Sequence, residues 1–283
     1  MSALRLGTRG SALALAQARE VAGLLDGPVE LVTIATAGDA DRGRGDKSRW
    51  VGALEAALVA GEIDLAVHSA KDVPGELAAG TAIVATPRRA SPFDVLVGEH
   101  ALSAVREGAR VGTSSVRRRA QLLAARPDLE VCELRGNVDT RLAKRAAGEV
   151  DVLVLAAAGL ERLGRAAGGH LVGGVFIPAP GQGIIAVQAR AGSPAADAAR
   201  AADHPASHAA LDEERAAVRA LEASCHTPVG VLALDGRVHG FVGLPDGSAW
   251  MLDESASGAE LAERMLAAGA ADLLRDAARL TAA

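Results

Sequence analysis

Short apolar runs alternate with Ala- and Leu-rich stretches through most of the chain. The runs are rich in β-branched residues and bounded by polar or Gly/Pro positions, which is typical of strands. These predicted strands lie at residues 4–7, 29–35, 63–67, 82–85, 94–97, 110–112, 130–134, 152–156 and 184–188. Apolar positions at helical spacing predict helices at residues 11–25, 51–60, 115–125 and 138–147. This alternation predicts an α/β fold with a mostly parallel sheet covered by helices on both faces.

Three segments interrupt the pattern and suggest how the chain is divided. Residues 37–49 form a loop rich in glycine and charge, and PAPGQG at 178–183 cannot be regular structure. Residues 193–207, rich in Ala, Ser, Pro and Asp, resemble a linker. Beyond this linker the pattern predicts a helix at 211–221, a few strands and one long helix at 258–279. At roughly 100–150 residues per domain, a chain of this length should form two or three domains.

Composition and charge exclude some classes of partner. Of the 283 residues 49% are hydrophobic but only 2% are aromatic, and the net charge is −5. A nucleic-acid-binding protein would need a basic surface and stacking rings, so this class is disfavoured. The average hides a basic segment, since residues 110–145 hold nine basic and four acidic side chains. That local excess predicts a binding site for an anionic ligand.

The sequence also indicates a cellular compartment. Cys132 and Cys225 are the two cysteines, too few for a disulfide framework. The first residues lack the apolar core of a signal peptide. No run of about 18 uncharged apolar residues, the length that spans a bilayer, is present. We therefore expect a cytoplasmic protein that does not enter a membrane.

Polar motifs follow the predicted strands, where sheets of this kind bind ligands. They are GTRGS at 7–11, HSAKDVP at 68–74, GTSSVRR at 112–118, LRGNVDTR at 134–141 and GLER at 159–162. Taken singly, the serines could be helix N-caps, the arginines a solvated helix face, and Lys71–Asp72 a surface ion pair. Taken together, guanidinium groups beside N-capping hydroxyls form receptors for carboxylate or phosphate. Five such motifs predict a ligand with several anionic groups.

Two side chains in these surroundings could carry chemistry. Asp72 lies among cations and should stay ionised, so it could stabilise a developing positive charge or move a proton. Cys225 lies in a turn between a helix and a strand. A buried cysteine, a thiol protease with His226 and a zinc ligand are alternatives, but no partner acid and no ligand-spaced cluster accompanies it. A small buried apolar residue is the commonest role of a free cysteine.

The motifs, in their order along the chain, resemble those of the porphobilinogen deaminase (hydroxymethylbilane synthase) family. They are LRLGTRGSALALAQA, HSAKDVP, GTSSVRRRAQ, LRGNVDTRLAK, AAAGLERLG, PAPGQG and ASCHTPVG, and the resemblance covers essentially the whole chain. It implies a transferase of porphyrin and haem biosynthesis. This enzyme would join four porphobilinogen molecules head to tail with release of ammonia, and then release the linear tetrapyrrole hydroxymethylbilane by hydrolysis.

The resemblance also implies roles for residues. Cys225 would hold a dipyrromethane cofactor through a thioether, and Asp72 would be the catalytic carboxylate; no metal is implied. Lys47 and Trp50, in or beside a lid formed by residues 37–49, could contact substrate. The residues implied in binding the carboxylates of cofactor and substrate are Arg9, Ser11, Lys71, Thr113, Ser114, Ser115, Arg117, Arg118, Arg135, Gly136, Asn137, Arg141 and Arg162.

The implied fold has three domains. Residues 1–88 with 176–192 would form one lobe like those of periplasmic binding proteins, and residues 89–175 a second, with the active-site cleft between them. Residues 193–283 would form a smaller α+β domain that carries the cofactor cysteine. The implied partner is porphobilinogen, without nucleic acid or membrane, and the implied state is a monomer.

Some positions depart from the family pattern. This chain has Trp50 for a phenylalanine, Gly52 for a lysine, Ala223–Ser224 for two glycines, and Gln188 for an acidic residue.

The alternative to an enzyme of this family is a two-lobed anion-binding protein without catalysis. That alternative explains the arginines and the fold, but it does not explain Cys225.

Overall fold

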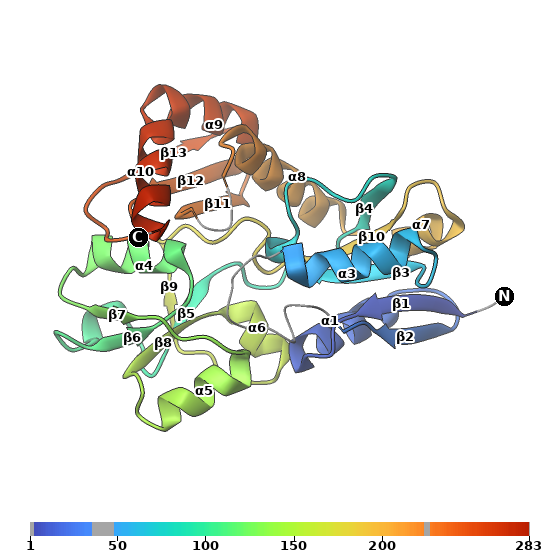
Figure 1. Cartoon of the computed structure of the whole chain (residues 1–283), viewed down its shortest axis with the longest axis horizontal. Helices are drawn as coiled ribbons and strands as arrows, with labels where there is room; N and C mark the ends of the chain where they lie inside the picture. The colour runs from blue at the N-terminus through green and yellow to red at the C-terminus, as the bar shows by residue number, and fades with distance from the viewer. Residues whose placement is uncertain (1–2, 36–47, 224–226, 283) are drawn as a thin grey trace. The chain divides into compact units, whose positions relative to one another are not determined.

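The structure is a computed structural model that describes residues 3–35, 48–223 and 227–282 (Figure 1). The chain forms two compact units. Unit 1 comprises residues 1–90 and 183–211, and unit 2 comprises residues 91–182 and 212–283. The three-domain division implied by the resemblance stays a prediction.

Unit 1 is built on a five-stranded sheet. Its strands, in spatial order, are β2 (Val29–Thr33), β1 (Leu4–Thr8), β3 (Leu65–Ser69), β10 (Ile185–Arg190) and β4 (Thr81–Ala85). β1 pairs in parallel with β2 and β3, whereas β10 pairs antiparallel with β3 and β4. The carboxyl ends of β1 and β3 therefore lie at the same edge of the sheet.

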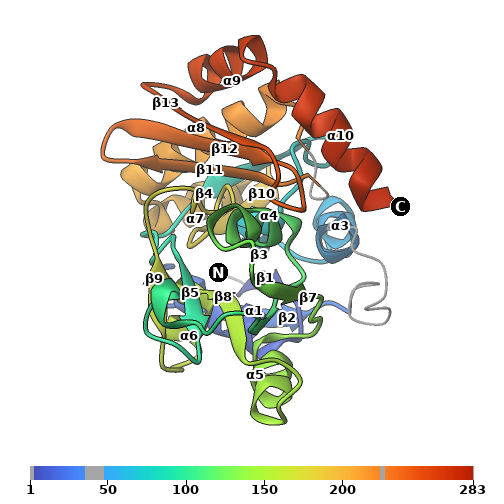
Figure 2. The same ribbon diagram turned by 90° about the vertical axis from the view of Figure 1, so that its left-hand side faces the viewer.

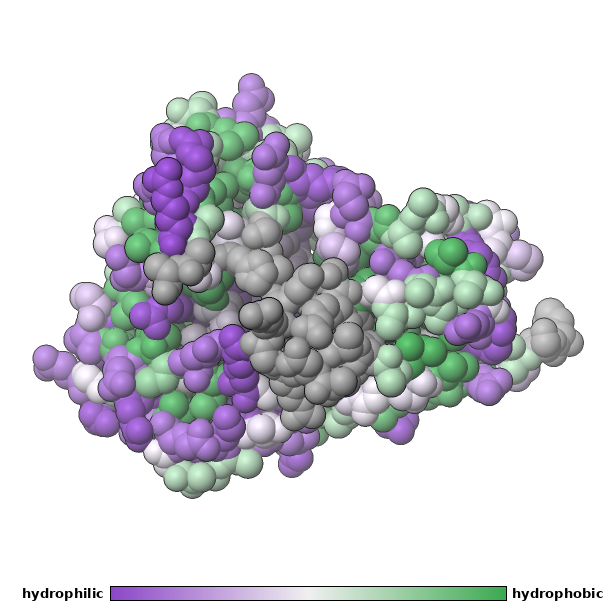
Figure 3. Space-filling view, in the orientation of Figure 1, coloured by the Kyte–Doolittle hydropathy of each residue, from purple (hydrophilic) through white to green (hydrophobic). Residues whose placement is uncertain are grey.

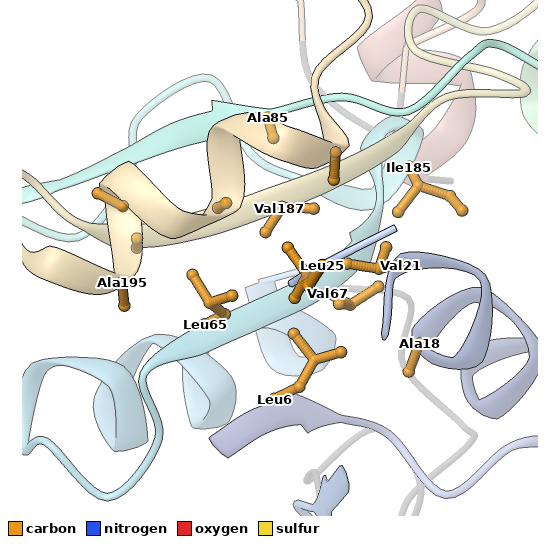
Figure 4. Close-up of a cluster of buried hydrophobic side chains, with 14 residues drawn as sticks. Leu6, Ala18, Val21, Leu25, Leu65, Val67, Ala85, Ile185, Val187 and Ala195 are labelled. Atoms are coloured by element: carbon orange, nitrogen blue, oxygen red, sulfur yellow. The ribbon is translucent and has the colours of Figure 1, made fainter. Parts of the chain in front are cut away.

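Helices cover both faces of this sheet because side chains alternate along each strand. Leu65 and Val67 point to the face covered by α1 (Ala12–Ala22) and α7 (Pro194–Ala199), where they converge with Leu6 and Val187 (Figure 4). Ala66 points to the opposite face, where it packs against α3 (Ser48–Val59). A 3-10 turn, η1 (Ala70–Asp72), follows β3 directly. A second one, η3 (Arg200–Ala202), follows α7.

Unit 2 contains a five-stranded sheet with the same pattern of parallel and antiparallel pairings, although its fourth strand is the first of the unit in sequence rather than the last. Its strands are β7 (Glu130–Cys132), β6 (Arg110–Gly112), β8 (Val152–Ala156), β5 (Asp94–Val97) and β9 (Gly169–Leu171), in spatial order. β6 pairs in parallel with β7 and β8, and β5 pairs antiparallel with β8 and β9. α4 (Val116–Ala125) packs on one face, and α5 (Val138–Ala146) and α6 (Ala157–Arg162) on the other. A 3-10 turn, η2 (Leu102–Ala104), lies between β5 and β6.

The remainder of unit 2 is an antiparallel sheet covered by helices. β11 (Val229–Leu234), β12 (Arg237–Gly243) and β13 (Trp250–Ser255) pair in chain order. The helices α8 (Pro205–Ala220), α9 (Gly258–Ala267) and α10 (Ala270–Ala282) lie beside this sheet (Figure 2). Apolar side chains of the second half of α8, of α9 and of α10 pack on it. The outer surface of α10 is hydrophilic (Figure 3). A helix with one apolar and one polar side is the expected cover for such a sheet.

The α/β class is confirmed, but three expectations about its elements were wrong. Each five-stranded sheet is mixed, with two parallel and two antiparallel pairings. Residues 193–207 are no linker, because Ser193 caps α7, η3 follows and α8 begins at Pro205. The long C-terminal helix is broken at Gly269, whose φ of +100° ends α9 and separates it from α10.

In the part of the chain that the structure describes, no helix is both long enough and apolar enough to span a bilayer.

Candidate active site

Unit 1 holds a pocket of about 100 Å³ where β1 and β3 end. Four residues predicted from the motifs line it: Arg9, Ser11, Lys71 and Asp72. The structure therefore brings together a carboxylate, two cations and a hydroxyl from two segments far apart in sequence. The other lining residues are Leu13, Ala14, Gln17, Val51, Val67, His68 and Ser69.

Local structure explains how the predicted residues reach the pocket. Ser11 is the N-cap of α1, and its hydroxyl accepts a hydrogen bond from the Ala14 N–H at 3.2 Å. Lys71 and Asp72 belong to η1, whose first residue donates its N–H to the Ile184 carbonyl on the segment entering β10. Ser69, just before η1, bonds the Gln17 side chain of α1 at 2.9 Å. The Lys71–Asp72 segment is thus held from two sides.

A chain of hydrogen-bonded polar side chains begins at the pocket residue His68, and His68 and Gln188 in it are buried. His68 Nε2 is 3.0 Å from Gln188 Oε1 on β10. Gln188 Nε2 donates to Glu55 Oε1 at 2.8 Å and to Thr81 Oγ1 at 2.7 Å. Burial lowers the pKa of His68 to about 4, although Gln188, Glu55 and Asp72 act to raise it. The imidazole is therefore neutral at physiological pH.

Two loops of unit 2 bring further predicted residues together. Thr113 follows β6 and is buried, and its hydroxyl accepts from the Ser115 N–H at 3.1 Å. Ser115 is the N-cap of α4, as one interpretation of the sequence had it. Ser114 instead accepts from Arg141 Nη2 on α5 at 2.9 Å. The GTSSVRR and LRGNVDTR motifs therefore meet through the Ser114–Arg141 bond.

The LRGNVDTR motif has its own backbone requirements. Gly136 has a φ of +131°, and a Cβ there would lie 2.7 Å from Thr140 Cγ2, so glycine is required. Asn137 caps α5 by accepting from the Thr140 N–H at 2.8 Å. Arg135, with its side chain 45% exposed, donates to Glu133 Oε1 at 2.6 Å. Arg162, half-buried, is the last residue of α6.

Arg117 and Arg118 are only 4% and 7% exposed, so their interpretation as a solvated helix face is wrong. Both pair with Asp94, the first residue of β5, at 2.9 Å for Arg117 Nη1 and 2.7 Å for Arg118 Nη2. Gln182, from the PAPGQG segment, donates to the same carboxylate at 2.9 Å. Burying an unpaired guanidinium group costs free energy, because the charge loses its hydration. The carboxylate that Arg117 and Arg118 share offsets this cost, so two adjacent cations can be buried.

The charges in this buried cluster do not cancel. Burial acts to raise the pKa of Asp94, but Arg117 and Arg118 outweigh it and hold the pKa well below its usual range. Asp94 is therefore ionised and supplies one negative charge to two guanidinium groups. The three side chains together retain one positive charge, and the buried Arg117 Nε has no hydrogen-bond partner among the described residues. An anionic group is the ligand chemistry that complements such a cluster.

Three predicted residues cannot be placed. Lys47 and Cys225 lie outside the described residues. Trp50 belongs to α3, but its side chain is outside the described part of the chain. Among the residues that are described, no group of three or more His, Cys, Asp or Glu side chains is arranged to hold a metal ion.

Comparison with known proteins identifies the family of this chain. A family model described as porphobilinogen deaminase, dipyromethane cofactor binding domain, matches residues 4–198. The chain belongs to the porphobilinogen deaminase family. Porphobilinogen deaminase of Rubrobacter xylanophilus is 45% identical to it over 96% of both chains. That of Thermus thermophilus is 44% identical over 98% of this chain and 95% of its own.

Solved structures with a detectable likeness are more distant. A periplasmic substrate-binding protein of an ABC transporter from Coxiella burnetii covers 72% of this chain and 94% of its own, with 16% identity and a TM-score of 0.44. A nutrient-binding protein of Burkholderia cenocepacia bound to methionine covers 72% and 93%, with 13% identity and a TM-score of 0.44.

The residues present fit the cofactor that the family model names. Pyrroles of this class carry two carboxylates each, and the buried cluster of Arg117, Arg118 and Asp94 retains the positive charge that a carboxylate would neutralise. Arg141 and Ser114 add donors from the neighbouring loops of unit 2. The donor set is therefore suited to a polycarboxylate.

Sequence reasoning missed several residues of these sites. Asp94 lies in a predicted strand and Gln182 in the PAPGQG motif, and neither was assigned a role, yet they organise the buried arginines. Gln17 and His68 line the pocket and both lie inside motifs of the resemblance, LRLGTRGSALALAQA and HSAKDVP, but neither was among the predicted site residues. A buried polar residue opposite an arginine cannot be recognised without knowing which strands are neighbours.

Proposed function

We propose that this chain is a hydroxymethylbilane synthase that joins four porphobilinogen molecules head to tail, with loss of one ammonia for each, and releases the linear tetrapyrrole. The observation that carries the proposal is the pocket in which Asp72 lies with Arg9 and Lys71, on a chain that belongs to the porphobilinogen deaminase family. A binding protein without catalysis could share the cations and the carboxylate, but the relatives that match almost the whole chain are porphobilinogen deaminases.

Asp72 is proposed as the catalytic residue. Loss of ammonia from porphobilinogen leaves a positive charge spread over the pyrrole and its methylene group. An ionised carboxylate beside that charge stabilises it, and the same oxygen can accept a pyrrole N–H or move a proton. The bonds of Ser69 to Gln17 and of Ala70 to Ile184 hold the η1 turn, so Asp72 is positioned before substrate binds.

The arginines of both units are proposed to bind the acetate and propionate groups. Arg9 and Lys71 supply the cations of the unit 1 pocket. Arg117, Arg118, Arg135, Arg141 and Arg162 supply those of unit 2, with Thr113, Ser114, Ser115, Gly136 and Asn137 contributing hydroxyl, amide or backbone groups. Each charge-assisted bond stabilises the bound ligand by roughly 1.5–3 kcal/mol. Several are needed, because a growing chain adds two carboxylates with each unit.

Cys225 is proposed to hold the dipyrromethane cofactor through a thioether, since a thiolate is a competent nucleophile for a pyrrole methylene. When bound, that group supplies the pyrrole position at which the product chain grows. Lys47 and Trp50 are proposed to contact substrate. A monomeric state and a cytoplasmic location also stay predictions from the sequence.

Replacing Arg135 tests the carboxylate assignment most cleanly. Its side chain is 45% exposed, so Arg135→Ala should fold normally, whereas a change at the buried Arg117 would also destabilise unit 2. Loss of one charge-assisted bond worth roughly 1.5–3 kcal/mol is expected to slow turnover of porphobilinogen ten- to hundredfold at limiting substrate, or to stall it at a defined chain length. Consumption of porphobilinogen and release of ammonia measure the rate.

The matched control for this experiment is Arg106→Ala. Arg106 is an exposed arginine of unit 2 that pairs with Asp151 and belongs to none of the motifs. It should leave turnover unchanged. Equal rates for Arg135→Ala and Arg106→Ala, with the same distribution of enzyme-bound intermediates, would remove Arg135 from the binding site.

A further inference from the structure

The orientation of the Gln188 amide is fixed by two groups that can only accept. Glu55 is a carboxylate that already accepts the Ala78 N–H at 3.1 Å. The Thr81 hydroxyl donates its single hydrogen to the Ala78 carbonyl at 2.6 Å, which leaves only its lone pairs for Gln188. Both hydrogens of Gln188 Nε2 are therefore used by Glu55 and Thr81. Gln188 Oε1 must face His68.

The Gln188 orientation in turn determines which nitrogen of His68 carries the proton. A carbonyl oxygen only accepts, so the bond between His68 Nε2 and Gln188 Oε1 requires a hydrogen on Nε2. In the neutral ring Nδ1 is then the acceptor. Nothing in the described chain donates a hydrogen bond to it. His68 is 5% exposed and lines the same pocket as Asp72 and Lys71.

The charged groups that face His68 come from three elements. Glu55 on α3 and Asp72 on η1 favour the protonated imidazole, and Arg9 after β1 opposes it. Burial outweighs the two carboxylates, and the pKa of His68 is lowered to about 4. An amide at position 188 adds no charge to this balance. A carboxylate there would add one directly against His68 Nε2.

We propose that Gln188 is a positioning residue that holds His68 as the neutral Nε2–H tautomer and so keeps the imidazole from adding a further positive charge beside Asp72, where Arg9 and Lys71 already lie. The consequence for turnover rests on the proposed function. If Asp72 stabilises the cation formed by loss of ammonia, an imidazolium beside it competes for the same carboxylate. An acidic residue at position 188, where the resemblance expects one, would let that imidazolium form. With glutamine at position 188, the enzyme therefore keeps its turnover at lower pH than it would with an acidic residue there.

Gln188→Glu tests the proposal with a side chain of nearly unchanged shape. Its carboxylate would lie against both Glu55 and His68, and such a cluster takes up a proton to relieve the repulsion. We expect the titration midpoint of His68 to rise by about two pH units or more, to about 6 or above. As the pH is lowered, turnover of the variant should fall at a pH about one unit or more higher than the pH at which turnover of the wild type falls.

Nitrogen NMR of the 15N-histidine-labelled full chain reads the tautomer and the midpoint without any turnover. The His68 signal is assigned by its absence in His68→Gln. In the wild type it should show hydrogen on Nε2, an unprotonated Nδ1, and no titration from pH 8 to pH 5. A wild-type His68 with hydrogen on Nδ1, or with an ordinary midpoint near 6.5, would overturn the proposal.

Gln188→Met separates the lost hydrogen bond from the added charge. It keeps length and burial but offers no acceptor to Nε2, so His68 should stay uncharged and populate both tautomers. If Gln188→Met raised the midpoint as much as Gln188→Glu, the charge explanation would be wrong. If Gln188→Glu left both midpoint and pH profile unchanged, the proposal would fail. A wild type with the expected spectrum but no turnover would count against the proposed function alone.

Discussion

Asp72→Asn is expected to lower kcat for porphobilinogen by a factor of about 100 to 10,000, the range that positioned acid–base groups contribute. The amide keeps the size of the side chain but can neither neutralise the developing cation nor accept a proton. Asp72 is a half-buried residue of a short 3-10 turn held through its neighbours, so the fold should not depend on its charge. Initial rates at saturating substrate, with the midpoint of urea unfolding measured on the same preparation, check the expectation.

The control for this experiment is Asp26→Asn. Asp26 is an exposed aspartate of unit 1 that lies after α1 and does not line the pocket. It should have wild-type kcat and the same unfolding midpoint. Wild-type rates for Asp72→Asn would remove Asp72 from the mechanism. Loss of rate together with a large drop in unfolding midpoint would show instead that Asp72 acts through the fold.

Asp94→Asn is expected to destabilise unit 2 by about 3–5 kcal/mol. The amide can still accept a hydrogen bond, but it leaves Arg117 and Arg118 as two adjacent buried cations without a counter-charge. The sequence contains two tryptophans, Trp50 and Trp250, and Trp250 lies in unit 2. In a Trp50→Phe background, the fluorescence of Trp250 during urea unfolding therefore reports the stability of that unit.

The pH dependence gives a second signature of Asp94. Its pKa in the folded protein is well below the ordinary value, so its contribution to the free energy of unfolding is fully present above about pH 4. That contribution is lost as the pH falls further towards the folded-state pKa. Asp94→Asn should therefore lose less stability than the wild type between pH 4 and pH 2. Parallel stability curves for the two proteins would contradict this role.

Asp128→Asn provides the comparison within the same unit. Asp128 pairs with Arg126 at 2.6 Å, a shorter contact than either of those made by Asp94, but at the surface. Surface pairs contribute little, because solvent screens them and both side chains lose freedom. Asp128→Asn should thus be much less destabilising than Asp94→Asn. Equal losses would show that burial of the arginines does not determine the effect.

The ends of several strands were predictable because the apolar run that forms a strand and the polar motif that follows it are both local features of the sequence. Short apolar runs predict β1, β3, β6 and β8, and the polar motifs that follow these strands are visible in the sequence. The directions of the strands were not predictable in the same way. An apolar run such as β5 or β10 does not record which way its neighbour runs, so the mixed sheets were read as mostly parallel. Direction depends on how the chain returns to the sheet.

Composition gave a wrong prediction for a segment whose small residues pack closely against a sheet. Residues 193–207 have the alanines, serine and prolines of a linker, but Ser193 and Pro194 start a helix whose Ala195, Ala196 and Ala199 are buried against the unit 1 sheet. Small side chains allow a helix to approach a sheet closely. The same composition therefore fits an exposed linker and a tightly packed helix, and only the packing separates them.

The candidate site likewise contains residues that were predictable from local motifs and contacts that were not. Arg9, Ser11, Lys71 and Asp72 were predicted and share one pocket, because their motifs follow neighbouring parallel strands. The burial of Arg117 and Arg118 was not predicted, since it depends on Asp94 from a strand distant in the sequence. The relation of Gln188 to His68 likewise arises only from the pairing of β10 with β3. These contacts arise from the pairing of strands that are distant in sequence, and no local sequence pattern predicts that pairing.

The attachment of a dipyrromethane group to Cys225 is tested most directly by the intact mass of the denatured chain. The wild type, incubated with porphobilinogen and freed of unbound pigment, should exceed the mass of the bare polypeptide by two linked pyrrole units. Cys225→Ser treated identically should show the polypeptide alone, while Cys132→Ser should keep the added mass. An unmodified wild type, or an adduct that persists in Cys225→Ser, would contradict the account.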